Sequence, residues 1–237
     1  MNSIYEEILN AKSQGRRLLA ILIDPEKTPP RQAETLSNKI AAAGASHIFI
    51  GGSTAAVNFD EVVKAFQRFS KLPIVLFPGS SDQLSNHAHA ILFLSLLSGR
   101  NPEYLISQHV KAAPLLKNTN LEIVPTAYIL IESGTQTAVE RVSRTSPMPT
   151  KYPQKIVDTA LAGEMMGNRL IYLEAGSGAK NPVPPEVIQK VASEISVPLI
   201  VGGGIRSKSA IDAAFAAGAD MVVIGTAFEE NTEFFEE

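Results

Sequence analysis

Eight short apolar runs alternate with helix-like segments along the whole chain, and this pattern constrains the fold more than any other feature. Most are unbroken runs of Ile, Val, Leu and Phe, as in parallel strands that are covered on both faces. The predicted strands are residues 19–24, 47–51, 74–77, 91–97, 122–130, 170–174, 199–202 and 221–225. The predicted helices are residues 30–43, 59–69, 102–117, 153–166, 185–195 and 207–217.

Alternation of this kind requires right-handed crossovers and a parallel sheet. Eight strands in 237 residues match the length of about 250 residues that is typical of one (β/α)₈ barrel. We therefore predict a single α/β domain over residues 1–237, a parallel (β/α)₈ TIM barrel with an N-terminal cover helix at residues 4–14. An open doubly wound sheet is the alternative, although the chain has no early Gly-x-Gly-x-x-Gly turn.

Three segments depart from the regular alternation. Only residues 79–90 separate the third and fourth strands, which predicts an irregular third crossover. Residues 132–152 form a long connection rich in Ser, Thr and Pro, and we predict that it is a mobile flap over the substrate. The acidic end, residues 228–237, is expected to form a short last helix.

The composition excludes several classes of function. A net charge of −3 provides no basic field, so we expect no nucleic acid partner. The chain has no cysteine, which excludes disulfides and thiolate chemistry. The start of the chain is polar and no apolar run is long enough to span a membrane, so we expect a soluble, cytoplasmic protein.

Glycines cluster where the last two predicted strands end. Gly203 and Gly204 follow the seventh strand, and Gly225-Thr226 follow the eighth. Glycine lets backbone N–H groups approach a phosphate closely, and the loops after strands seven and eight often form the phosphate site of a barrel. The alternative is that these glycines only allow tight turns. We predict a phosphate site here.

The sixth strand carries a carboxylate at its end. Tyr172 and Glu174 are two residues apart and therefore point to the same face of the strand. Catalytic groups of barrels lie at the carboxyl ends of the strands, and Gly176-Ser177-Gly178 would add hydrogen-bond donors. Glu174 is either a catalytic group or one half of an ion pair.

The first strand ends in Asp24, which is a candidate magnesium ligand because Mg²⁺ prefers carboxylate and hydroxyl oxygens. Lys27, three residues later, would face a diphosphate. Ser53, after the second strand, would supply a hydroxyl. The alternatives are an Asp-Pro turn with a solvated lysine, and a hydroxyl that caps a helix.

Taken together, the motifs resemble the geranylgeranylglyceryl phosphate synthase family, which includes bacterial heptaprenylglyceryl phosphate synthases. The matching stretches are Ile23-Asp24-Pro25-Glu26-Lys27, Gly51-Gly52-Ser53, Ser98-Gly99-Arg100-Asn101-Pro102, Tyr172-Leu173-Glu174-Ala175-Gly176-Ser177-Gly178, Gly202-Gly203-Gly204-Ile205 and Gly225-Thr226. The Tyr-Leu-Glu-Ala-Gly-Ser-Gly form is closer to the geranylgeranyl-using branch. The heptaprenyl branch has a substrate-binding lysine two residues before its aspartate, and this chain has Leu22 there.

The resemblance implies a Mg²⁺-dependent prenyltransferase that joins sn-glycerol 1-phosphate to an allylic prenyl diphosphate, with geranylgeranyl diphosphate the expected donor. Glu174 and Tyr172 would be catalytic, Asp24 and Ser53 would bind the metal, and Lys27 and Arg100 would bind diphosphate. The glycerol phosphate would contact Tyr172, Leu173, Glu174, Ala175, Gly176, Ser177, Gly178, Gly203, Gly204, Gly225 and Thr226. The resemblance also implies a homo-oligomer, dimer or hexamer, and the prenyl product implies a transient contact with a membrane surface.

The hydrocarbon tail requires an apolar groove, which residues 91–97 and 128–130 would line unless they only form core. One competing function is another phosphosubstrate barrel, an isomerase or cyclase of the histidine-pathway type. That enzyme would need a second acid or base near residues 125–128, where no carboxylate occurs. The other is a non-catalytic barrel that binds a phosphorylated metabolite.

Overall fold

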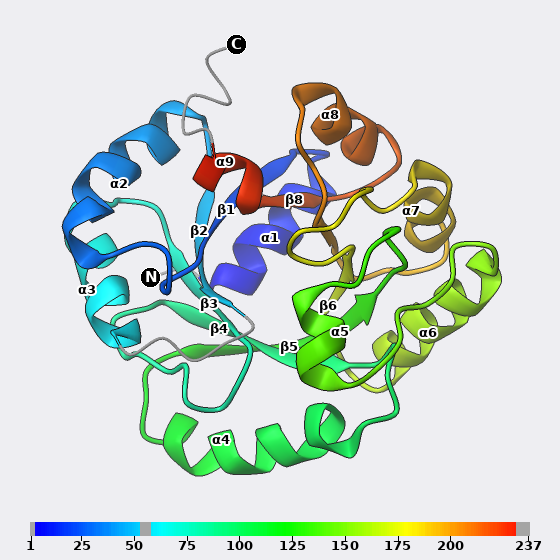
Figure 1. Ribbon diagram of the computed structural model, residues 1–237, viewed down its shortest axis with the longest axis horizontal. Coiled ribbons are helices and arrows are strands. Elements are labelled where there is room, and N and C mark those ends of the chain that lie inside the picture. The colour runs from blue at the N-terminus through cyan, green and yellow to red at the C-terminus, as the bar shows by residue number, and fades with distance from the viewer. Residues whose placement is uncertain (1–2, 53–57, 231–237) are drawn as a thin grey trace.

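The computed structural model describes residues 3–52 and 58–230. Eight parallel strands close into one barrel in chain order, each paired with the next and β8 paired with β1 (Figure 1). The strands are β1 (Leu18–Ile23), β2 (His47–Gly52), β3 (Ile74–Pro78), β4 (Ala90–Leu96), β5 (Glu122–Leu130), β6 (Leu170–Glu174), β7 (Leu199–Gly202) and β8 (Met221–Ile224). The predicted TIM barrel is confirmed, and the alternative of an open sheet is wrong.

Helices surround the barrel as predicted from the spacing of the apolar runs (Figure 1). They are α1 (Ile4–Ser13), η1 (Pro30–Gln32), α2 (Ala33–Ala42), α3 (Phe59–Phe69), η2 (Glu103–Ser107), α4 (Gln108–Leu116), α5 (Ala138–Ser143), α6 (Pro153–Met165), α7 (Pro185–Ala192), α8 (Lys208–Ala216) and α9 (Thr226–Glu230). The helix predicted at residues 102–117 is a π-helical turn, η2, followed by α4. The predicted last helix is described only as far as α9. None of the helices that the structure describes is long and apolar enough to cross a membrane.

Alternate residues of each strand pack into two separate hydrophobic cores, one inside the barrel and one between the barrel and the helices. The side chains of Ala20 and Phe49 pack inside the barrel. Their strand neighbours Ile21 and Ile48 pack outward against the helices. This explains why the strands read as continuous apolar runs, because both faces of the sheet are buried.

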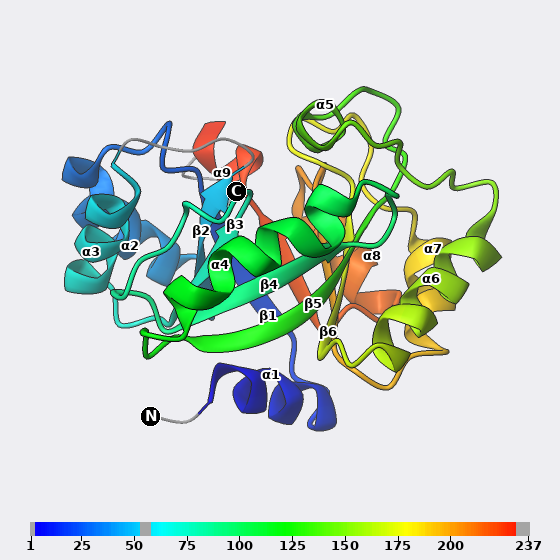
Figure 2. The ribbon, with the colours of Figure 1, turned by 90° about the horizontal axis from the view of Figure 1, so that it is seen from below.

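Helix α1 closes the bottom of the barrel, at the end opposite to α5 (Figure 2). Ile8 is 1% exposed and packs into the interior core. At the start of the helix, the Glu122 carboxylate accepts hydrogen bonds from Ser3 Oγ (2.5 Å), Ile4 N (2.5 Å) and Tyr5 N (3.1 Å). The predicted cover helix is therefore present and is bonded to β5.

The third crossover contains no helix, as predicted, and residues 79–89 form turns held by glutamine side chains. Gly79 N donates to Gln83 Oε1 (2.9 Å), and Ser81 N donates to Gln108 Oε1 (2.8 Å). Residues 132–152 contain α5, whose first turn has a capping box between Thr137 and Glu140. The mobility of this connection stays a prediction.

Candidate functional site

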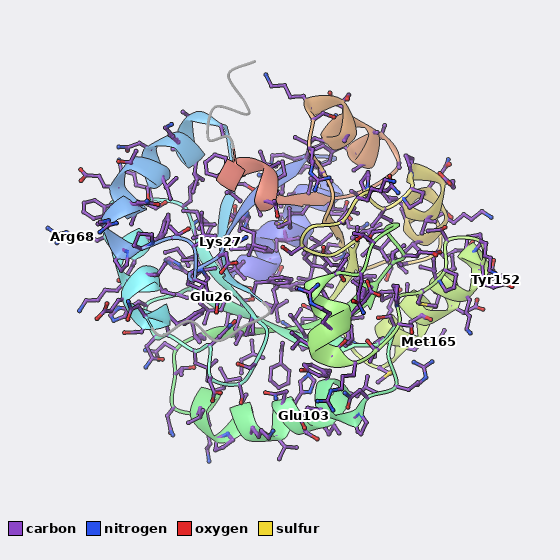
Figure 3. The ribbon with its side chains drawn as sticks, viewed as in Figure 1. Glu26, Lys27, Arg68, Glu103, Tyr152 and Met165 are labelled. Carbon is purple, nitrogen blue, oxygen red and sulfur yellow. The ribbon has the colours of Figure 1, made fainter. Side chains whose placement is uncertain are left out.

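The described residues enclose one large cavity of about 540 Å³ at the carboxyl ends of the strands. Figure 3 shows Glu26 and Lys27, two of its lining residues, inside the ring of helices, whereas Arg68, Tyr152 and Met165 lie on the outer rim. Most of the predicted site residues line this cavity together, from β1, β6, β7 and β8: Asp24, Lys27, Tyr172, Glu174, Gly176, Ser177, Gly178, Gly203, Gly204, Gly225 and Thr226.

Glu174 is a buried carboxylate at the end of β6. It is 5% exposed, and its Oε1 accepts a hydrogen bond from Gly176 N at 2.6 Å. In the part of the chain that the structure describes, Glu174 makes no ion pair. Burial raises the pKa of its carboxyl group to about 7, opposed by the hydrogen bond from Gly176 and, less, by the Tyr172 hydroxyl. The carboxylate can therefore accept or release a proton near neutral pH.

Tyr172 lies beside Glu174 in an aromatic cluster. Its ring centroid is 5.4 Å from that of Tyr128 and 5.4 Å from that of Phe77. Burial, and then the charge of Glu174, raise the pKa of the Tyr172 hydroxyl well above its usual value, so the hydroxyl stays protonated. Among the described residues this hydroxyl has no partner of normal hydrogen-bond geometry. The hydroxyl is itself fully buried beside Glu174, so a ligand reaches it only if a neighbouring side chain moves.

The loops after β6 and β7 converge closely because glycines meet there. Gly203 has a φ of +81°, and a Cβ on it would lie 2.5 Å from the backbone nitrogen of Gly176. A Cβ on Gly204 would lie 2.7 Å from the carbonyl oxygen of Asn181 in the β6–α7 loop. Any side chain at either position would push the two loops apart, so this packing requires Gly203 and Gly204, which are also suited to a phosphate.

Asp24 and Lys27 lie together at the cavity mouth, after β1. Asp24 Oδ2 is 3.6 Å from Lys27 Nζ, and Asp24 Oδ1 accepts a hydrogen bond from Glu26 N at 3.0 Å. The side chain of Asp24 is 24% exposed. A Cβ on Gly52 of β2 would lie 3.3 Å from Asp24 Oδ1, so the glycine leaves space beside the carboxylate.

Three predicted site residues lie outside the cavity lining, and a fourth lies outside the described residues. The side chains of Leu173 and Ala175 point into the outer core, away from the cavity lining. Arg100 donates its Nη1 to the carbonyl oxygens of Leu97 (2.8 Å) and Gly99 (2.7 Å), outside the lining. Ser53 lies outside the described residues. Contacts of these four with substrate or metal stay predictions.

An apolar extension leads from the barrel mouth toward β3, β4 and α4. Its lining includes Phe77, Leu84, Phe93, Tyr104 and Ala112. No helix lies in the third crossover, between β3 and β4 (Figure 1). Helix α4 packs against β4, where the ring centroids of Phe93 and His109 are 4.4 Å apart. Of the predicted groove residues, Ile91, Leu92, Phe93, Leu94, Leu96 and Tyr128 line the cavity. Ile129 belongs to the outer core and Leu130 to the inner core.

Sequence reasoning missed several lining residues of the connections that follow the strands. Arg141 lies in the connection between β5 and β6, on α5. Arg206 follows the glycines of β7, and Ser80 and Ser81 lie in the third crossover. The position of α5 over the cavity depends on tertiary contacts. The sequence shows only that this connection is long.

A closed parallel barrel with a cavity at its carboxyl end, a buried carboxylate and converging glycine loops defines a (β/α)₈-barrel enzyme. The chain belongs to the PcrB family, whose profile matches residues 12–237. It is 51% identical over 237 residues to a geranylgeranylglyceryl phosphate synthase of Flavobacterium johnsoniae, with 100% of this chain and 98% of that protein covered. The predicted family resemblance is therefore confirmed.

Solved structures of other proteins have the same fold as this chain. The crystal structure of (S)-3-O-geranylgeranylglyceryl phosphate synthase from Thermoplasma acidophilum in complex with sn-glycerol-1-phosphate has a TM-score of 0.94 and 36% identity, with 100% of this chain and 95% of that chain covered. The N-acetylmannosamine-6-phosphate 2-epimerase of Clostridium perfringens has a TM-score of 0.60 at 14% identity over 92% of each chain, and that likeness shows the fold alone.

Proposed function

We propose that this protein is a prenyltransferase that forms an ether between sn-glycerol 1-phosphate and geranylgeranyl diphosphate. The observation that carries the proposal is the position of Glu174, a buried carboxylate with a pKa raised to about 7, beside the converging glycine loops. The same cavity continues into the apolar extension. The similarity to the Flavobacterium and Thermoplasma enzymes supports the same reaction.

The phosphate of sn-glycerol 1-phosphate would bind at the glycine loops. The loops after β6, β7 and β8 each present glycine to the same part of the cavity, at Gly176, Gly203 and Gly225. Backbone N–H groups that no side chain covers are suitable donors to phosphate oxygens. Ser177 and Thr226 also line the cavity and would add hydroxyl donors.

Glu174 would act as the general base. The glycerol hydroxyl oxygen attacks the allylic carbon, the bond from that carbon to the diphosphate oxygen breaks, and the hydroxyl proton passes to Glu174. The electron pair of the broken bond leaves with the diphosphate. The Tyr172 hydroxyl, which has no described partner of normal geometry, would hold the glycerol in position for this attack.

The residues at β1 fit a magnesium ion. Mg²⁺ is usually held by one or two carboxylates together with substrate phosphates and water, and Asp24 has space beside it at Gly52. No group of three or more acidic or histidine side chains that could hold a metal occurs within residues 3–52 and 58–230. Asp24 would hold the ion, Ser53 is proposed as a second ligand, and Mg²⁺ would neutralise the diphosphate.

The apolar extension would take the prenyl tail. Its walls come from β3, β4, η2 and α4, with Phe77, Phe93, Leu94 and Tyr104 among them. Burial of a long hydrocarbon against such walls is favoured by about 25 cal/mol per Å² of apolar surface. The tail would lie next to Tyr128 and point away from the glycine loops.

An isomerase or cyclase has less support. Such an enzyme needs a second acid or base near the middle strands, and the carboxylates among the described lining residues are Asp24, Glu26 and Glu174, from the β1 and β6 sides. Homo-oligomer formation as a dimer or hexamer, a transient membrane contact and a cytoplasmic location stay predictions.

The test is incubation with sn-glycerol 1-phosphate, Mg²⁺ and a series of allylic prenyl diphosphates, with the product mass as the readout. We expect the prenyl ether of glycerol phosphate, formed fastest from geranylgeranyl diphosphate. Binding of sn-glycerol 1-phosphate without turnover of any prenyl diphosphate would contradict the proposal and indicate a barrel that only binds the metabolite.

The Asp24→Asn variant tests the metal site in the same assay. We expect the variant to fold, because Asp24 lies at the rim of the barrel, and to lose most Mg²⁺-dependent turnover. Unchanged activity with an unchanged Mg²⁺ dependence would show that Asp24 is only a turn residue.

A further inference from the structure

Helix α5 lies between two parts of the cavity, the glycine loops after β6 and β7 and the apolar extension. At its start, Thr137 packs on the β6–α7 loop so closely that a Cβ on Gly176 would lie 2.6 Å from Thr137 Cβ. At its end, Asn101 Nδ2 donates to the carbonyl oxygen of Ser143 (2.8 Å). The Tyr104 hydroxyl donates to the carbonyl oxygen of Val142 (3.2 Å). The helix therefore runs from the glycine loops to the segment that borders the apolar extension (Figure 1).

One face of α5 belongs to the cavity. Ala138, Val139, Arg141 and Val142 all line it. Val139 also packs against the core cluster that contains Tyr128 and Tyr172. The helix thus places three apolar side chains and one guanidinium over the cavity, between the glycine loops and the apolar extension.

Within residues 3–52 and 58–230, no acidic side chain pairs with Arg141. In the described part of the chain, the Arg141 side chain makes no hydrogen bond or ion pair. The other cations of the described lining are Lys27 and Arg206. Lys27 lies 3.6 Å from Asp24, and Arg206 directly follows the glycines of the β7–α8 loop. Of these three lining cations, Arg141 is the one that lies on α5, beside the apolar side chains of that helix.

From this arrangement we infer that Arg141 binds the diphosphate of the prenyl substrate, an inference that rests on the proposed function. The tail occupies the apolar extension and the reacting carbon must reach the glycerol hydroxyl beside Glu174, so the diphosphate has to lie at the junction of the two halves. Helix α5 spans that junction. A guanidinium binds phosphate oxygens bidentately and remains charged at all physiological pH values.

The contact would be strongest during bond cleavage. When the allylic C–O bond breaks, its electron pair moves to the diphosphate and the negative charge there increases. Lys27 shares its charge with Asp24, so Arg141 supplies positive charge from the opposite side of the barrel mouth. Loss of a hydrogen bond to a charged group predicts a fall of about 10–100-fold in kcat/KM for the prenyl diphosphate.

The experiment compares Arg141→Gln and Arg141→Lys with Arg144→Gln. Arg144 lies at the end of the same helix, outside the cavity lining, so its variant removes the same charge from the same segment. Each variant is assayed with geranyl and geranylgeranyl diphosphate, and inhibition by inorganic pyrophosphate with Mg²⁺ is measured. Circular dichroism and thermal unfolding confirm that each variant is folded.

We expect Arg141→Gln to lower kcat/KM equally for both prenyl diphosphates, to weaken pyrophosphate inhibition at least 10-fold, and to change KM for sn-glycerol 1-phosphate less than 2-fold. Arg141→Lys should recover part of the loss, and Arg144→Gln should behave as wild type. If Arg141→Gln matches Arg144→Gln, the inference is wrong. A raised KM for sn-glycerol 1-phosphate alone would also overturn it, because Arg141 would then bind that substrate. A loss of kcat/KM for geranylgeranyl diphosphate only would overturn it as well, because Arg141 would then contact the tail.

The wild-type assay separates this inference from the proposed function. If wild-type protein turns over no prenyl diphosphate, the proposed function itself fails. If wild-type protein is active and Arg141→Gln is equally active, the function stands and only the role of Arg141 is lost.

Discussion

Glu174 shows how one residue acquires its chemistry from its surroundings. A carboxylate in water has a pKa near 4.5 and is a weak base, but burial raises the pKa of Glu174 to about 7. One hydrogen bond, from Gly176 N at 2.6 Å, partly stabilises the charged form. Burial and the lack of an ion-pair partner among the described residues are the conditions under which a carboxylate becomes an effective base at neutral pH.

Replacement of Glu174 by Gln should keep the size of the side chain and remove the base. We expect kcat to fall by about 10²–10⁴-fold, the usual cost of losing general-base assistance. Affinity for sn-glycerol 1-phosphate, measured by calorimetry, should change much less, because backbone amides are proposed to hold the phosphate. A large loss of affinity with little change in kcat would make Glu174 a binding residue instead.

The raised pKa of Glu174 also predicts a pH-dependent stability. The unfolded chain loses this proton near pH 4.5 and the folded protein near pH 7, so the folded state is progressively destabilised between these values as pH rises. Glu174→Gln removes that cost. Its free energy of unfolding should exceed that of wild type by up to about 3 kcal/mol above pH 7, and the difference should vanish below pH 4.5. Denaturant unfolding at several pH values measures it, and a constant difference would contradict the prediction.

At the scale of elements, the strands could be predicted more completely than the loops. The bounds of β5, β6 and β7 agree with the predicted ranges. Every residue of β6 and β7 is buried, so an apolar run marks most of each strand, whereas β5 begins with residues that are partly exposed. The glycine positions after β6 and β7 could likewise be predicted, since Gly176, Gly203 and Gly204 have a positive φ and leave no space for a Cβ. A Cβ on Gly225, after β8, would make only ordinary contacts. The position of Arg141 over the cavity could not be predicted from the sequence. The contacts that place α5 join Thr137 to Gly176 and Asn101 to Ser143, and these residues are far apart in sequence.

The convergence of the β6 and β7 loops can be tested at Gly203. A Cβ there would lie 2.5 Å from Gly176 N, so Gly203→Ala must separate the two loops. We expect at least a 10-fold loss of affinity for sn-glycerol 1-phosphate, measured by calorimetry. Gly167→Ala is the control, because Gly167 also has a positive φ (+91°) but a Cβ on it would meet nothing within 4 Å. It carries the same backbone strain without loop contact. Equal affinities in the two variants would show that the convergence does not build the phosphate site.

At the scale of the whole molecule, the two ends of the barrel have separate tasks. The carboxyl end has the cavity, the glycine loops and α5, and the opposite end is covered by α1 (Figure 2). Side chains fill the interior between them, including Phe49 and Val75, which are 0% and 1% exposed. Changes at the closed end should therefore alter stability without altering the site, which is the usual division in this fold.

Glu122 is the residue on which that division can be tested. Its carboxylate accepts hydrogen bonds from Ser3 Oγ, Ile4 N and Tyr5 N and so holds the start of α1 on β5. Glu122→Ala leaves these donors without their acceptor, at a cost of about 1–3 kcal/mol. In a domain of this size each kcal/mol lowers Tm by about 2–4 °C. Glu194→Ala, an exposed position whose side chain makes no hydrogen bond or ion pair in the described structure, is the control.

Thermal unfolding and steady-state kinetics at 25 °C, on the same preparations, decide the outcome. We expect Glu122→Ala to unfold several degrees below both wild type and Glu194→Ala, while kcat and both KM values stay within 2-fold of wild type. The cavity and the Glu122 contacts lie at opposite ends of the strands, so α1 can loosen without moving Glu174. A Tm equal to that of Glu194→Ala would mean that α1 is held by its other contacts, the buried side chains of Ile4, Ile8 and Ala11 and the Lys12–Asp220 ion pair. A loss of kcat at 25 °C in the fully folded variant would show that the cover helix and the site are coupled through the barrel interior.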